Sequence, residues 1–118
     1  MSTIIYQGAP GSLPHTIQYI PEDDSPVVLC LTGSAWSQTE NEKIGIQAII
    51  NQTQGPQAQI FSNTKLVHRA LTPEYKEFNF PIVVDKDSGK IQPVTIRLLS
   101  TTGATEFDGN DYISLIAL

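Results

Sequence analysis

The chain has 118 residues, a length that suits a single domain able to bury a sizeable core without metals or disulfides. Its 7 basic and 12 acidic residues give a formal net charge of −5, which argues against binding to nucleic acid or to anionic membranes. A single cysteine excludes a disulfide within the chain. The sequence has neither a secretory signal nor a bilayer-spanning apolar run, so we expect one soluble domain over residues 1–118.

Clusters of turn-forming residues divide the sequence into short apolar segments with the periodicity of strands. Within residues 43–51, for example, Ile44, Ile46 and Ile50 fall on one side at a period of two. We expect about eight strands, which include His15–Ile20, Val27–Leu31, Lys43–Asn51, Gln57–Ser62, Leu66–Leu71, Val94–Leu98 and Tyr112–Leu118. Short strands without βα alternation predict an all-β fold, a two-sheet antiparallel β-sandwich with jelly-roll topology preferred.

Three segments have less definite patterns. Residues 72–79 fit a short helical turn, with Thr72 as cap, or an ordinary loop. Residues 51–53 fit the polar tip of a hairpin ending at residues 55–56, and residues 85–89 fit a turn, with a metal loop as the alternative. The pattern leaves open whether the first 25 residues join the sandwich.

Two predicted strands, Val27–Leu31 and Tyr112–Leu118, are apolar on both faces. The outer face of a sandwich normally meets water, so these strands imply a second covering layer. That layer is either a loop of the same chain or another subunit, and we favour a subunit in a homo-oligomer. The predicted interface residues alternate along the last strand: Tyr112, Ser114, Ile116 and Leu118.

The ending Thr105–Ile116 (TEFDGNDYISLI) resembles the closing strand of the tumour-necrosis-factor/C1q-like jelly-roll family. Val94–Leu99 (VTIRLL) before it is similar to that family's preceding strand, and Ile44–Asn51 and His68–Leu71 occupy the order of its middle strands. The similarity covers residues 26–118. It implies a ten-strand jelly roll, a homotrimer, and a role as a recognition head or structural knob.

The segment Glu106–Asp111 offers three carboxylates and an amide in six residues. Oxygen ligands of this kind suit calcium, so Asp108, Asn110 and Asp111 are candidate metal ligands. The alternative is a loop whose Asp and Asn side chains hydrogen-bond their own backbone. We expect no cofactor other than calcium at this loop.

Trp36 lies among small polar residues, where an indole can stack on a sugar or anchor a protein partner. Trp36, Gln38 and Asn41 are therefore candidate ligand-binding residues, although Trp36 can equally close the end of the core. The two histidines lie in no catalytic signature, and His68 fits the polar face of a strand, so we expect no enzyme activity. The preferred hypothesis is a trimeric module for assembly or surface recognition. The alternative is a carbohydrate-binding module or lectin, with calcium assistance.

Overall fold

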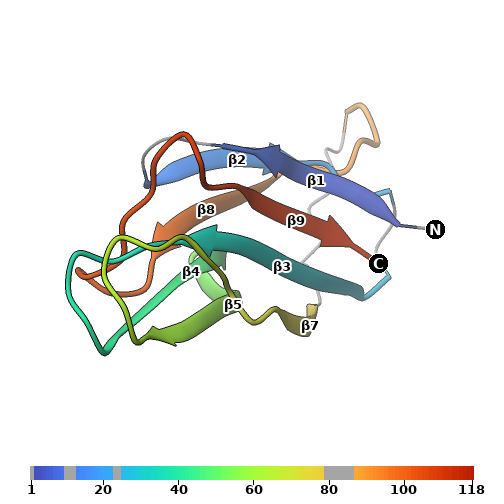
Figure 1. Cartoon of the computed structure of the whole chain (residues 1–118). Coiled ribbons are helices and arrows are strands. Elements are labelled where there is room, and N and C mark those ends of the chain that lie inside the picture. Colours follow the sequence, from blue (N-terminus) through green and yellow to red (C-terminus); the bar gives the residue numbers. More distant parts are fainter. Residues whose placement is uncertain (1, 10–12, 23–24, 79–86) are drawn as a thin grey trace.

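The computed structural model describes residues 2–9, 13–22, 25–78 and 87–118. These residues form nine strands and no helix (Figure 1). The described residues therefore include no helix that is long and apolar enough to span a bilayer. The strands are β1 (Thr3–Gly8), β2 (His15–Tyr19), β3 (Val27–Ala35), β4 (Glu42–Ile50), β5 (Thr53–Ser62), β6 (Arg69–Ala70), β7 (Glu74–Phe78), β8 (Val94–Ser100) and β9 (Ile113–Ala117).

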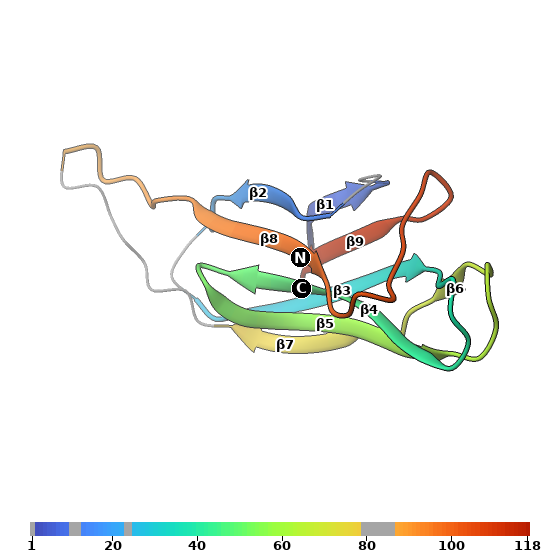
Figure 2. The same cartoon turned by 90° about the vertical axis from the view of Figure 1, so that its left-hand side faces the viewer.

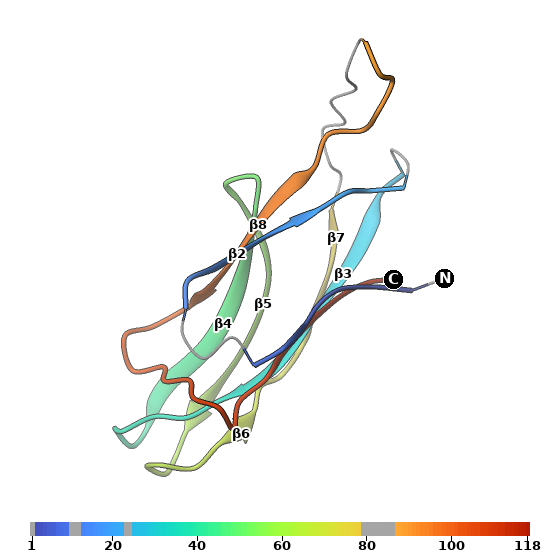
Figure 3. The same cartoon turned by 90° about the horizontal axis from the view of Figure 1, so that it is seen from above.

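The strands form two antiparallel sheets that pack face to face, which Figure 3 shows from above. Sheet A has the order β1-β9-β3, and β6 and β7 pair with different stretches of the far side of β3. Sheet B has the order β2-β8-β4-β5. The first strand thus pairs with the last, and the second with the last but one. The predicted all-β, two-sheet antiparallel sandwich is confirmed.

Alternating apolar residues from the two sheets make the core. The predicted inward set on β4, which includes Ile44, Ile46 and Ile50, is fully buried. From sheet A, Leu31 and Leu115 face it and are also fully buried. Both doubly apolar segments prove to be strands, and each directs one of its two apolar faces into the core.

Residues 72–79, expected to be a helical turn or loop, instead contain strand β7. Pairing with β3 and contacts across the open side of the sandwich determine this outcome. The Gln57 N–H of β5 donates to Glu74 Oε2 at 2.8 Å, and Lys76 Nζ donates to the Gln54 carbonyl at 3.1 Å. These partners lie about twenty residues away in sequence, so a local pattern carries no sign of them.

Two other expectations need correction. Of the predicted strand Leu66–Leu71 only Arg69–Ala70 forms a strand, and Leu66 adopts a positive φ of 56° that lies outside the strand region. The hairpin tip lies at Asn51 and Gln52, whose φ values of 48° and 68° fit a two-residue turn, so β5 already resumes at Thr53. Of the predicted turn at residues 85–89, the structure describes residues 87–89, and residues 85 and 86 lie outside the described residues.

Of the first 25 residues, the described strands β1 and β2 do join the sandwich, and residues 1, 10–12, 23 and 24 lie outside the described residues. β1 forms the edge of sheet A beside β9, and β2 forms the edge of sheet B beside β8 (Figure 2). A shift in register between Ile4 and Tyr6 inserts one extra residue, so that Ile5 and Tyr6 both pack against the core. Ile4 is left on the outer face.

We predict that Leu31→Ala lowers the free energy of unfolding by about 2–5 kcal/mol, because the side chain is fully buried and its removal leaves a cavity. Urea unfolding followed by circular dichroism measures this change. Val67→Ala is the control, since Val67 lies exposed in a loop and its truncation is expected to cost less than about 0.5 kcal/mol. Equal losses in the two variants would contradict the described core.

Candidate functional site

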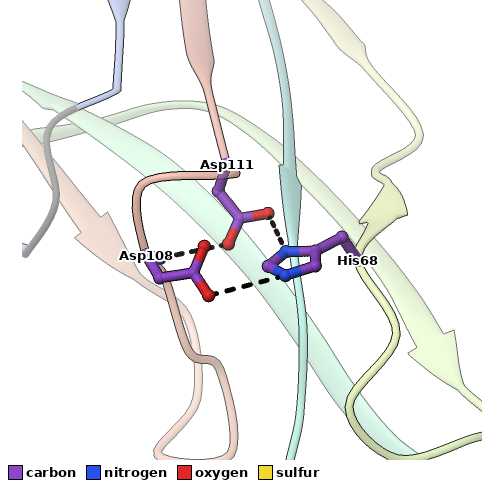
Figure 4. Close-up of side chains that lie close together, drawn as sticks. All are labelled: His68, Asp108 and Asp111. Carbon is purple, nitrogen blue, oxygen red and sulfur yellow. Dashed lines mark hydrogen bonds and ion pairs between the residues drawn. The ribbon is translucent and has the colours of Figure 1, made fainter.

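The β8–β9 connection lies at the end of the sandwich opposite the C-terminus (Figure 1). There the side chains of His68, Asp108 and Asp111 converge, as Figure 4 shows. His68 comes from the segment between β5 and β6, and both aspartates come from the β8–β9 connection. Backbone hydrogen bonds fix that connection against β3, because Trp36 and Glu106 exchange two N–H···O bonds at 3.1 and 2.8 Å. The connection that carries both aspartates is therefore fixed by backbone hydrogen bonds to Trp36.

Asp111 is the buried member of the cluster, with 2% of its surface exposed. Its Oδ1 accepts a 2.8 Å hydrogen bond from Ser34 Oγ, and its Oδ2 accepts one at 3.2 Å from the Asp108 N–H. Ser34 is itself placed by strand pairing, since its N–H donates to the Tyr112 carbonyl at 3.0 Å. A buried carboxylate needs such donors to offset its lost hydration.

The imidazole of His68 lies between the two carboxylates. Nδ1–H donates to Asp111 Oδ1 at 2.8 Å, while Nε2 lies 3.5 Å from Asp108 Oδ2. The hydrogen bond to Asp111, together with the charges of both aspartates, raises the pKa of His68 above its usual 6.5 despite opposing desolvation. The indole of Trp36 packs at a tilt on the ring, with centroids 6.1 Å apart.

The structure brings together two of the three predicted metal ligands, Asp108 and Asp111. Asn110 is exposed and contributes its backbone N–H, which donates to Asp108 Oδ1 at 2.7 Å. This turn shows the self-hydrogen-bonded loop that was the alternative interpretation. Sequence reasoning missed His68, which lies in a loop and not on the polar face of a strand. Its only signal was that a histidine is the commonest metal ligand.

The three predicted ligand-binding residues differ in how far they are buried. Trp36 is half-buried against His68, and its buried Nε1 has no hydrogen-bond partner among the described residues. Gln38 and Asn41 are exposed in the β3–β4 connection, where Asn41 adopts a positive φ of 59°. Trp36 is thus packed in part against the cluster, while Gln38 and Asn41 lie in solvent.

The four predicted interface residues share the outer face of sheet A, because their neighbours Ile113 and Leu115 point into the core. Tyr112 and Leu118 are about half exposed, Ile116 is partly exposed, and Ser114 is shielded. Strand pairing aligns Ile116 with one residue on each of three other strands. We call the resulting apolar row across four strands the sheet A row: Ile4, Ile116, Cys30 and Tyr75.

Comparison with protein-family models, with curated proteins and with solved structures found no significant match. A serine, a histidine and an aspartate are present, but the Ser34 hydroxyl donates to Asp111 and not to the imidazole that would activate it. The arrangement is suited to holding a proton or a cation at His68.

We predict that the stability contributed by protonated His68 is lost with rising pH. Because the folded pKa lies above the unfolded value, this contribution is complete below about pH 6.5 and disappears as the pH rises through the raised pKa. Urea unfolding of wild type and His68→Gln between about pH 5 and 9 tests it. The stability gap between the two proteins should narrow as the pH rises.

His15→Gln is the control for this measurement, because it removes the other histidine, which lies beside Tyr6 and far from the cluster in sequence. Its free energy of unfolding, measured over the same pH range, gives the effect of removing a histidine outside the cluster. A gap for His68→Gln that stays constant or widens with pH would contradict the described ion pairs.

Proposed function

We propose that this chain is a non-catalytic assembly module that self-associates through the outer face of sheet A. The observation that carries the proposal is the sheet A row, which places four apolar or weakly polar side chains in one line across β1, β9, β3 and β7. Ile4 is 59% exposed and Tyr75 is 63% exposed. No described segment covers these two residues, so they lack the covering layer that apolar strands need.

The size of this surface supports a protein contact. Ile4, Tyr75, Tyr112 and Leu118 each expose about half or more of their surface. Side chains of this size leave roughly 100 Å² each, or about 400 Å² summed over the face. Backbone and polar neighbours on the same face can raise this area toward the roughly 800 Å² per partner of a standard interface.

A second copy of this chain is the partner that we infer. The sheet A row contains no charged side chain, and Glu77 is an acidic neighbour at its margin, opposite Val28. Copies with a net charge of −5 repel one another over most of their surface, so an uncharged face is where two of them can approach at least cost. The resemblance to trimeric jelly rolls makes three copies the expected number.

The strand order supports the finer proposal that the sandwich is a jelly roll. Such a fold winds eight strands into two four-stranded sheets through two Greek keys. Here β1-β9-β3-β7 lies over β2-β8-β4-β5, with the first and last strands paired. β6 adds a short pairing beside the other end of β3. Glycan binding has less support, because Trp36 packs against His68.

We expect wild-type protein to have a mass near three times 12.9 kDa by light scattering, and Ile4→Asp or Ile116→Asp to shift it to the monomer. A charge in a desolvated apolar contact is costly, whereas Ile4 is exposed enough in the monomer to tolerate it.

Phe61→Asp is the matched control, since Phe61 is 68% exposed on β5 of sheet B. It is expected to leave the oligomer intact. A monomeric wild type, or equal dissociation by Phe61→Asp, would contradict self-association through sheet A, and a stable dimer would contradict the trimer alone.

A further inference from the structure

We propose that His68 and Asp108 form a binding site for a divalent transition metal ion of the zinc class, with Asp111 as the positioning residue. The three side chains offer ligand atoms that lie within 4.8 Å of one another. They come from two segments some 40 residues apart, and their side chains converge (Figure 4). This inference is independent of self-association, because it uses no residue of the sheet A row.

The spacing of the two proposed ligand atoms fits a metal better than a direct contact. His68 Nε2 and Asp108 Oδ2 lie 3.5 Å apart, which is long for a hydrogen bond between an imidazole and a carboxylate. Nitrogen and oxygen ligands about 2.0–2.2 Å from zinc in a tetrahedral site are separated by about 3.3–3.5 Å. The ion would therefore enter between these atoms without moving either segment.

Asp111 prepares His68 for this role. In the neutral imidazole, the 2.8 Å hydrogen bond from Nδ1–H to Asp111 selects the tautomer whose Nε2 carries the free lone pair, which a metal ion would take in place of a proton. Metal-bound histidines commonly donate their second ring N–H to a carboxylate in this way, which orients the ring and makes it more basic. Ser34 holds the same carboxylate in place at 2.8 Å.

Asp108 is prepared in a similar manner. Its Oδ1 accepts the Asn110 N–H at 2.7 Å, so Oδ2 is the oxygen that faces the imidazole. The side chains of His68 and Asp108 are 33% and 41% exposed, so an ion reaches them from solvent and water completes its coordination. Imidazole nitrogen favours zinc, copper or nickel, whereas calcium prefers oxygen alone. The ligand class therefore differs from the calcium expected from the aspartates.

Calorimetric titration of the folded chain with Zn²⁺ alone, near neutral pH, tests the proposal. We expect one site per chain, no measurable binding in His68→Gln, and at least tenfold weaker binding in Asp108→Asn. Asp111→Asn, which keeps the shape but removes the charge, should weaken binding about 10–100-fold. Co²⁺ provides a second readout, because its visible absorption bands report nitrogen and oxygen ligands and should vanish in His68→Gln.

Two controls separate the site from adventitious binding. His15→Gln removes the other histidine, and Asn110→Ala removes a side-chain amide while keeping the backbone N–H that holds Asp108. Both should bind Zn²⁺ as wild type does. Circular dichroism verifies that each variant is folded, and Asp108→Asn changes a side chain that is 41% exposed. Binding that survives His68→Gln, an effect of Asn110→Ala equal to that of Asp108→Asn, or no saturation by Zn²⁺ would overturn the proposal.

Discussion

The antiparallel register between β3 and β9 determines both faces of sheet A at once. Pairing of Leu31 with Leu115 directs these residues into the core, and the same pairing places Cys30 beside Ile116 on the outer face. Because side chains alternate along a strand, a slip of one residue would exchange the two faces. The buried set therefore stabilises the register, and the register in turn fixes the composition of the outer surface.

The same pairing also positions the cluster at the end of the sandwich. Beyond the last paired residues, the Ser34 N–H still bonds the Tyr112 carbonyl, which brings Ser34 Oγ within reach of Asp111. Asp111 in turn orients the imidazole of His68 by accepting the hydrogen bond from its Nδ1–H. The buried carboxylate is thus a product of strand pairing, while its two partners in the cluster, His68 and Asp108, lie nearer to solvent. The pairing of β3 with β9 thus positions both the outer face of sheet A and the cluster of His68, Asp108 and Asp111.

Much of the fold could be predicted because the period-two alternation of apolar residues in a strand is visible within a short stretch of sequence. The period of two in β4 identified its inward residues, and the double apolarity of β9 identified both of its faces. β7 could not be predicted, because Glu74 and Lys76 find their partners on β5 only after folding. Likewise the Asp108–Asp111 loop was visible in sequence, whereas His68 reaches it through a contact that no local spacing encodes.

The contacts between β7 and β5 cover part of an exposed sheet edge. β5 is an edge strand, and unpaired N–H and C=O groups on an edge are a template for adding a foreign strand. Glu74 occupies the N–H of Gln57, Lys76 occupies the carbonyl of Gln54, and Thr72 bridges Gln59 on the same edge. Addition of a foreign strand to sheet B at β5 is therefore hindered along this stretch, whereas β2 forms the opposite edge of the same sheet.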